Sequence, residues 1–254
     1  MKAAKHILIL LLALTAPGIL RADFADAFQR AAQAYDAEQY KESADLYESL
    51  VNEGAAAPEV FFNLGNARFK NGEIGLAVLN YRRAQYFTPR DPDIRANMDY
   101  AMGRNGAVRW RETTVAQFSG RWSLREWAHA LIVIYWLAAV AAILWMLDAA
   151  RRPVYLRLLI VFAVLAVACI TGLRHWKSLQ RIPEAVVIND GLSAFFAPIE
   201  NSTAHFSLPA GSLVRTREQD GHWLKVEADG KEGWIPADAC RKVYAWLTAD
   251  MALE

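Results

Sequence analysis

The sequence lacks the patterns on which most catalytic sites depend. Its five histidines are dispersed, and no HExxH, CxxC or phosphate-binding loop occurs. Only two cysteines are present, Cys169 in an apolar run and Cys240 near the C-terminus, and we do not expect them to form a disulfide. Cys240 lies among apolar neighbours, which favours a buried, inert thiol over a nucleophile. We therefore expect no enzyme, cofactor or metal site.

The sequence also lacks a charge excess, since its formal net charge is only +1, which gives no indication of nucleic-acid binding. What it has instead is apolar residues, 54% of the chain, gathered in a few runs. The first run, 7–14, follows Lys2 and Lys5 and is broken by Pro17, a pattern typical of a secretory signal cleaved after Ala22. The alternative is a retained anchor helix. Either interpretation places the next segment outside the cytoplasm.

A repeat follows the signal. "YKESADLYESL" and "IGLAVLNYRRA" superpose with a shift of 34 residues. In the second copy, Gly65 and Ala77 are small where two helices approach, and Phe61, Leu64 and Tyr81 fill the space around them. This arrangement resembles a tetratricopeptide unit, which implies pairs of antiparallel helices.

The two copies differ in quality. Gly72 stands where a helix must end in a left-handed turn, and Arg68 stands where the tetratricopeptide pattern has an aromatic residue. The first copy, about 24–58, has Ala31 for the helix glycine and Glu38 for the turn glycine. A left-handed Glu38 would cost about 1 kcal/mol, so we expect that turn to differ in shape.

A capping helix is predicted after the repeats. Asp91 suits its N-cap, Pro92 its first turn and Gly103 its end, which gives five helices over 23–104. Two repeats and a cap are near the lower limit of stability for stacked repeats. We therefore expect the unit to be stabilised by contact with the membrane, a partner or a second copy.

Charge is divided between two halves of the repeat unit. Residues 23–59 hold nine acids and two bases, and 60–111 hold nine bases and four acids. Solvated helix faces would explain this, and so would a polarised surface that orients a partner or another copy of the chain. The candidate partner-binding residues, expected on a concave groove, are Asn66, Lys70, Asn97 and Arg104.

Two further apolar runs, 127–147 and 154–173, are long enough to cross a bilayer. Ser123 and Glu126 form a capping box before the first, and the six residues 148–153 allow only a reversal of direction. Neither run contains Asp, Glu, Asn or Gln, which favours an anchor over a transport path. A buried hairpin of a soluble protein is the alternative. Cations flank both ends, so the predicted signal decides the orientation, with both termini outside and the turn cytoplasmic.

Short β-type segments follow from residue 185: "AVVI", "LSAFF", "SLVRTRE", "HWLKVE" and "EGWIP". Five such strands predict a small closed barrel. The pattern of Gly211, Trp223, Val226, Gly230, Gly233 and Trp234 resembles a bacterial SH3 domain, although "LSAFFAP" departs from it. We expect Trp223 and Trp234 to pack within the barrel. The candidate groove residues are Phe195, Phe196 and Phe206, of which one or two must close the core.

The whole order of segments resembles the Bat E proteins of the bacterial aerotolerance operon, most specifically in "NLGNARFKNGEIGLAVLNYRRA" and the following "RDPDIRAN". The resemblance implies an envelope system with membrane-anchored von Willebrand A domain proteins and a MoxR-type ATPase. The expected parts are a signal peptide (1–22), repeats (23–104), a linker (105–126), a membrane helix (127–147), a cytoplasmic turn (148–153), a second membrane helix (154–173), a linker (174–183), an SH3-like domain (184–246) and a tail (247–254).

The expected function is a non-catalytic scaffold on the outer face of the bacterial cytoplasmic membrane. It follows from two recognition folds, an anchor without intramembrane polar groups, and no catalytic constellation. The alternatives are a peptidoglycan binder that acts through the SH3-like domain and a targeting subunit of a cell-wall enzyme. Self-association is a further possibility that the charge division leaves open.

Overall fold

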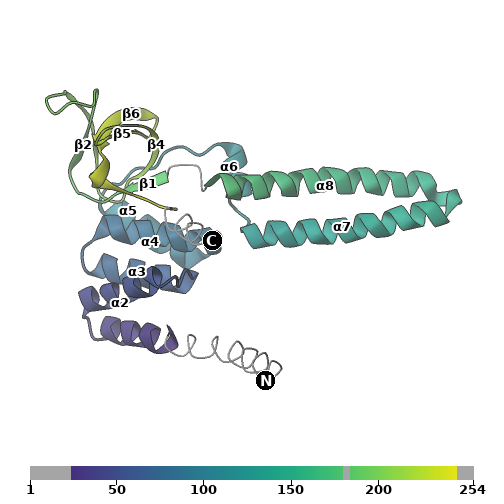
Figure 1. Ribbon diagram of the computed structural model, residues 1–254, viewed down its shortest axis with the longest axis horizontal. Helices are drawn as coiled ribbons and strands as arrows, with labels where there is room; N and C mark the ends of the chain where they lie inside the picture. The colour runs from purple at the N-terminus through teal and green to yellow at the C-terminus, as the bar shows by residue number, and fades with distance from the viewer. Residues whose placement is uncertain (1–23, 180–183, 245–254) are drawn as a thin grey trace, which may run out of the picture.

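A computed structural model of the protein describes residues 24–179 and 184–244. The described chain is mostly helical, with two long apolar helices followed by an antiparallel sheet (Figure 1). The predicted signal peptide at 1–22 and the predicted tail at 247–254 lie outside these residues.

Five helices form a stack in which each packs against the next, and this confirms the number expected. They are residues 24–36, α2 (Tyr40–Asn52), α3 (Pro58–Lys70), α4 (Ile74–Phe87) and α5 (Pro92–Arg104). The small residues lie where they were predicted: a Cβ on Gly65 would be 2.6 Å from the Tyr81 ring. Phe61, Leu64 and Tyr81 are buried around that contact. The α3–α4 pair is therefore held by close packing against a glycine.

Arg68, which replaces an expected aromatic residue, is buried in this stack. Its guanidinium pairs with Glu48 of α2 and, at 2.8 Å, with Glu73 just before α4. The basic half of the repeat unit thus meets the acidic half across α2 and α3, through one cation that joins three consecutive helices.

The turn after the first helix has the same shape as the turn after α3. Glu38 has φ +61° and Gly72 has φ +86°, and Gly106 after α5 has φ +64°. Each position lies 34 residues from the previous one, and its N–H donates to the carbonyl three residues earlier. The expectation of a different turn at Glu38 was wrong, because the glutamate accepts the left-handed conformation. The 34-residue geometry thus occurs three times.

The start of α5 was predicted correctly and its end was not. The Asp91 carboxylate accepts from the N–H groups of Asp93 (2.9 Å) and Ile94, with Pro92 in the first turn. Gly103 lies inside the helix, and the left-handed residue is Gly106. A helix continues through glycine at a cost of about 1 kcal/mol, so a glycine need not end it.

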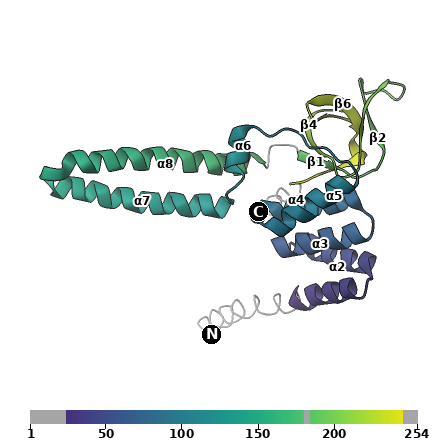
Figure 2. The ribbon, with the colours of Figure 1, turned by 180° about the vertical axis from the view of Figure 1, so that it is seen from behind.

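The two apolar helices form an antiparallel hairpin that projects from the rest of the molecule (Figure 2). They are α7 (Leu124–Leu147) and α8 (Arg152–Leu179), joined by the short helix η1 (Ala149–Arg151), and each has a mean hydropathy of 2.5 over its most apolar stretch. Most of that apolar surface is exposed, so a buried core hairpin is not what the structure shows. The predicted capping box is present: the Ser123 N–H donates to Glu126 at 2.8 Å, and Ser123 caps the Glu126 N–H. Both helices are long and apolar enough to cross a membrane.

The C-terminal sheet has seven strands rather than the five expected. They are β1 (Glu184–Val187), β2 (Leu192–Phe195), β3 (Ala204–Leu208), β4 (Leu213–Asp220), β5 (Trp223–Ala228), β6 (Lys231–Pro236) and β7 (Cys240–Lys242), with the short helix η2 (Ala237–Ala239) before β7. Their order is β3-β2-β6-β5-β4-β1-β7. A closed barrel would need pairing between the two ends of this order, β3 and β7. The prediction of a closed barrel was wrong, since no ladder among the described strands joins them. The two strands that were not predicted are β3 and β7. They are the edge strands of the sheet, where polar residues are tolerated.

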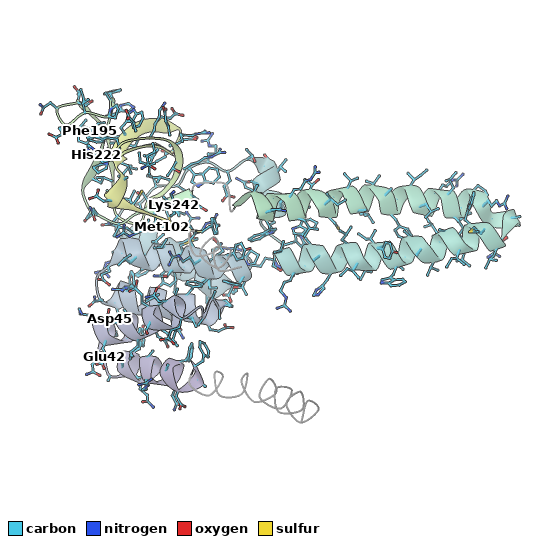
Figure 3. All side chains as sticks on the ribbon, viewed as in Figure 1. Glu42, Asp45, Met102, Phe195, His222 and Lys242 are labelled. Carbon is cyan, nitrogen blue, oxygen red and sulfur yellow. The ribbon has the colours of Figure 1, made fainter. Side chains whose placement is uncertain are left out.

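The sheet packs directly on the helical stack. A Cβ on Gly75 in α4 would lie 2.6 Å from the Val187 carbonyl oxygen, and one on Gly211 would lie 3.1 Å from Val78. Figure 3 shows this arrangement from labelled residues: Met102 of α5 and Lys242 of β7 lie where sheet and stack meet, and Phe195 lies on the far part of the sheet. The repeat unit therefore packs against the C-terminal domain of its own chain.

Residues 105–126, expected as a linker, are held against the sheet and hairpin. The Leu213 N–H donates to the Val108 carbonyl at 2.9 Å, and the Trp110 N–H donates to the Leu213 carbonyl at 3.0 Å. The short helix α6 (Thr114–Ser119) then packs on α8. This segment adds a parallel bridge at Arg109 and Leu213 beside the sheet.

Aromatic residues join the hairpin to the stack. The Trp176 indole of α8 donates to the Trp122 carbonyl at 2.7 Å and lies edge-on to Tyr86 of α4, with ring centroids 5.0 Å apart. Trp127 of α7 covers Gly172 so closely that a Cβ there would lie 2.4 Å from the indole. Residues from stack, hairpin and sheet thus share one apolar core.

Candidate functional site

A small cavity lies between the first helix, α2 and α3. Its volume is about 160 Å³, and its lining residues are Ala32, Tyr35, Asp36, Tyr47, Asn63 and Asn66. We call it the repeat groove. The Asn63 amide donates to the Tyr47 hydroxyl at 3.3 Å, and burial raises the pKa of both tyrosines. These phenols stay protonated at neutral pH, so the groove offers hydroxyl and amide groups that both donate and accept.

Of the four predicted partner-binding residues, Asn66 and Asn97 lie together. The Asn66 side-chain oxygen accepts from the Tyr81 hydroxyl at 2.9 Å and from the Asn97 amide at 3.1 Å. These bonds link α3, α4 and α5. Asn66 therefore holds the stack together at the edge of the groove that it also lines.

The other two, Lys70 and Arg104, are exposed and occupy equivalent positions 34 residues apart. Lys70 Nζ lies 6.0 Å from the Tyr40 ring centroid, and the Arg104 guanidinium lies 5.6 Å from that of Phe69. Each is a cation at the C-terminal end of its helix, available to an acidic partner.

The three predicted aromatic residues of the sheet have different environments. Phe206 packs against the sheet's core, and Phe195 lies edge-on to Trp223, with ring centroids 5.8 Å apart. Phe196 is 61% exposed and lies 4.1 Å from the His205 ring, centroid to centroid. Of the three, Phe196 thus has the most surface available for a ligand.

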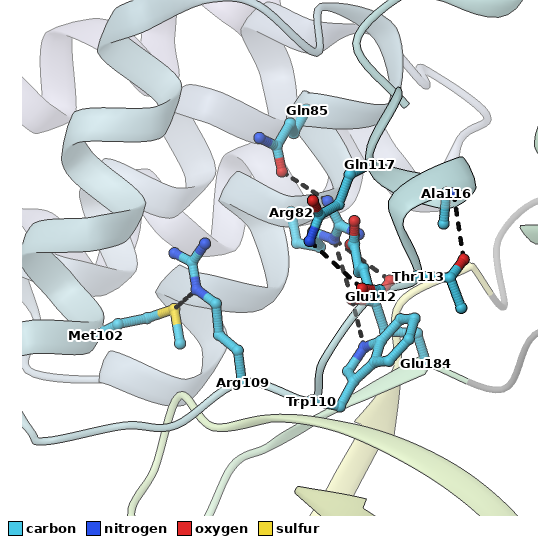
Figure 4. A network of polar contacts seen from close by, with 10 residues as sticks. All are labelled: Arg82, Gln85, Met102, Arg109, Trp110, Glu112, Thr113, Ala116, Gln117 and Glu184. Carbon is cyan, nitrogen blue, oxygen red and sulfur yellow. Dashed lines mark hydrogen bonds and ion pairs between the residues drawn. The ribbon is translucent and has the colours of Figure 1, made fainter. Parts of the chain in front are cut away.

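The most extensive polar network lies at the junction of stack, sheet and segment 105–113, shown in Figure 4. Arg82 of α4 is at its centre. Its Nε lies 3.1 Å from Glu184 Oε1 at the start of β1, and its terminal nitrogens reach Gln85 at 2.7 Å and Glu112 at 3.2 Å. The Trp110 indole completes the set at 3.4 Å from Glu184. One guanidinium thus connects three parts of the chain.

Electrostatics keep this network charged. Burial opposes the charge of Arg82, yet the neighbouring Glu184 and the other acidic groups around it raise the pKa of the guanidinium above its ordinary value. Burial raises the pKa of the adjacent Tyr244 phenol. Arg83, whose Nε donates to the Val243 carbonyl at 3.1 Å, is influenced by burial more than by its acidic neighbour Glu48, and burial lowers its pKa to about 10. Both arginines remain cationic at neutral pH.

Sequence reasoning did not predict this junction. The partners Arg82 and Glu184 are 102 positions apart, which no local pattern can connect. One signal was available: Glu184 directly precedes the apolar run "AVV", and an acid at the start of a buried strand requires a cationic partner. Had the charged residues of the repeat unit all been interpreted as solvated helix faces, Arg82 of α4 would have been placed in solvent.

The thiol of Cys240 was expected to be buried and inert. It is buried, and burial raises its pKa to about 11, so its reactive thiolate is scarce at neutral pH. Cys169 is a separate free thiol on α8.

Comparison with known proteins adds no identification. No protein-family model matches the chain, and no curated protein matches it.

Proposed function

We propose that the protein is a non-catalytic scaffold, anchored by α7 and α8 in the bacterial cytoplasmic membrane, that binds partner proteins on the outer face. In this proposal the helical stack is a tetratricopeptide unit and the sheet an SH3-like domain. Their combination supports membership of the Bat E family and a role in its aerotolerance system. The proposed partners are the membrane-anchored von Willebrand A domain proteins of that system.

The observation that carries the proposal is the mechanical connection between a recognition surface and the hairpin. The repeat groove lies on the first helix, α2 and α3, and the hairpin is fixed to α4 through Tyr86 and Trp176. Segment 105–113 is hydrogen-bonded to the sheet. A partner held by the groove would therefore take a defined position relative to the membrane, which is what a scaffold must provide.

The groove suits an extended peptide segment of the partner. Asn63, Asn66 and the Tyr47 hydroxyl present donors and acceptors of the kind that pair with a peptide backbone. Lys70 and Arg104, at the C-terminal ends of α3 and α5, add exposed positive charge to the stack, which favours acidic residues in the partner.

Sidedness follows from the predicted signal and from two spans. With the repeat unit exported and an even number of crossings, the sheet lies on the same outer side, and Arg151 and Arg152 mark a cytoplasmic turn. The direct packing of sheet on stack supports this, because both must be on one side of the membrane for Gly75 to meet Val187.

Affinity capture from membranes in mild detergent tests the proposal. The wild-type chain should recover a membrane-anchored partner, and the double variant Lys70→Ala, Arg104→Ala should recover at most about a tenth as much, the loss of about 1.4 kcal/mol of interaction. Arg241→Ala with Lys242→Ala, two exposed cations of β7, is the matched control and should leave recovery unchanged. Undiminished recovery by the Lys70, Arg104 double variant would refute these two cations as part of the binding surface.

Peptidoglycan binding through the sheet is the second candidate. The exposed Phe196, whose ring lies beside that of His205, favours it, since neighbouring rings offer a surface for sugar stacking. Sedimentation of the full chain in detergent with insoluble cell wall tests it. Retention that Phe196→Ala abolishes would support wall binding, and no retention of the wild type would remove it.

A further inference from the structure

A cleft lies at the junction, between the stack and the end of the hairpin that is nearest to the stack. Its volume is about 490 Å³, and it takes side chains from α4, α5, the segment that carries α6, and the end of α8. The residues that matter for its chemistry are Arg82, Arg95, Arg111, Arg121, His175 and Trp176. We call it the junction cleft.

The junction cleft is strongly basic. Five arginines line it against two glutamates, and both glutamates are already engaged by Arg82. Arg109 pairs with Asp99 outside the cleft. Arg111 and Arg121 form no ion pair with any of the residues that the structure describes. The cleft therefore has uncompensated positive charge, which an anion would neutralise.

Its position coincides with the membrane boundary of the hairpin. The apolar stretch 154–173 ends two residues before His175, and 127–147 begins six residues after Arg121. With a rise of about 1.5 Å per helical residue, His175 lies only about 3 Å beyond the apolar stretch. In a bilayer, this part of the cleft would be at the level of the lipid phosphates.

Exposed apolar side chains neighbour the cleft's lining residues Ala116, Gln117 and Arg121 in the chain. Val115 and Phe118 of α6 and Trp122 before α7 are 62%, 58% and 44% exposed. Exposed aromatic and aliphatic groups next to a basic cleft are typical of a surface that meets lipid, because acyl chains cover the former while headgroups occupy the latter. A free anion from solution would need no such apolar flank.

We propose that the junction cleft binds the phosphate of an anionic phospholipid headgroup, with Arg111 and Arg121 as its principal ligands. The inference rests on the membrane insertion of the proposed function and adds a lipid to it. The bound headgroup would lie between α6 and α8, in contact with both the hairpin and the repeat unit. It would thereby stabilise the orientation of the stack on the membrane.

Native mass spectrometry of the full chain in nonionic detergent tests this with equal amounts of phosphatidylglycerol and phosphatidylcholine. The wild type should retain phosphatidylglycerol in preference. The variant Arg111→Gln, Arg121→Gln should reduce that preference about tenfold or more, because both charged ligands of the phosphate are lost. The matched control, Arg151→Gln with Arg152→Gln, removes the same charge at the other end of the hairpin and should leave the preference intact.

Three results would overturn the proposal. Equal retention of both lipids by the wild type would show that the cleft does not select an anion. An equal loss of the preference in the control variant would show that phosphatidylglycerol is attracted to either cationic end of the hairpin, and not to the cleft in particular. Displacement of phosphatidylglycerol by 10 mM inorganic phosphate, a concentration chosen on the order of weak anion binding, would make the ligand a free phosphate. Partner capture is measured separately, so failure here leaves the scaffold proposal standing, and vesicle flotation shows independently whether the hairpin inserts.

Discussion

Arg82 of α4 and Glu184 of β1 are separated by 102 positions in the chain and by 3.1 Å in space, between Nε and Oε1. The carboxylate is almost completely buried, and the guanidinium reaches it from the side of the helical stack. This pair holds the sheet on the helices together with the close approach of Gly75 to Val187.

Loss of the guanidinium should be strongly destabilising. Arg82→Met leaves the buried Glu184 carboxylate without its cation, and we expect the free energy of unfolding to fall by about 3 kcal/mol. The double variant Arg82→Met, Glu184→Gln should recover most of that loss, because no unpaired charge remains. Denaturant unfolding in detergent measures both, and a double variant no more stable than the single one would contradict the account.

The close packing of the sheet on α4 requires glycine at position 75. Gly75→Val would bring a side chain to within 2.6 Å of the Val187 carbonyl, so the sheet must shift away. We expect lower thermal stability and faster proteolysis of segment 105–113. Gly103→Ala is the control, since a Cβ there meets nothing within 4 Å and alanine favours the helix. Equal behaviour of the two variants would mean that the close approach is unimportant.

The equivalent turns predict opposite effects for two substitutions. Glu38→Gly should stabilise the first helix pair by about 1 kcal/mol, because glycine adopts the left-handed φ without strain. Gly72→Ala should destabilise the second pair by a similar amount, since nothing lies within 4 Å of its Cβ position and backbone strain alone acts. Chemical denaturation distinguishes the signs, and two changes of the same sign would disprove the equivalence.

The loop after β1 should make stability depend on pH in acid. The pKa of Asp190 is lowered from its ordinary 3.8 by hydrogen bonds from the Asn105 amide and the N–H groups of Ala210 and Gly191. A lowered pKa in the folded state means that the stabilisation is complete above 3.8 and is lost as pH falls through the folded pKa. The melting temperature of the wild type should exceed that of Asp190→Asn at pH 6. The difference should shrink below about pH 4, and a difference that grew in acid would reverse the assignment.

Local signals in the sequence predicted the elements well. The turn at Gly72, the cap at Asp91 and the capping box at Ser123 each depend on residues within a few positions, and all three are present. The end of α5 was misplaced because Gly103 was judged alone. The 34-residue spacing from Gly72 indicates Gly106 instead, which was information the sequence contained.

Contacts between distant segments could not be predicted in this way. The strands β3 and β7 are short, polar edge strands, so their sequences show no clear alternation. The packing of the sheet on the stack depends on which elements meet in three dimensions. The position of segment 105–113 and the basic junction cleft depend on it as well. Asn66 illustrates the same limit, since only the structure shows that its side chain bonds to Tyr81 and Asn97.

Photo-crosslinking in intact membranes tests the central claim, that the helical stack presents a partner-binding surface outside the membrane. A photoreactive residue is placed at Lys70 or Arg104, and at Arg241 of β7 as the control. The account predicts a discrete adduct with another membrane-anchored envelope protein from the two stack positions and none from the control. No adduct from either stack position, or the same adducts from all three, would contradict it.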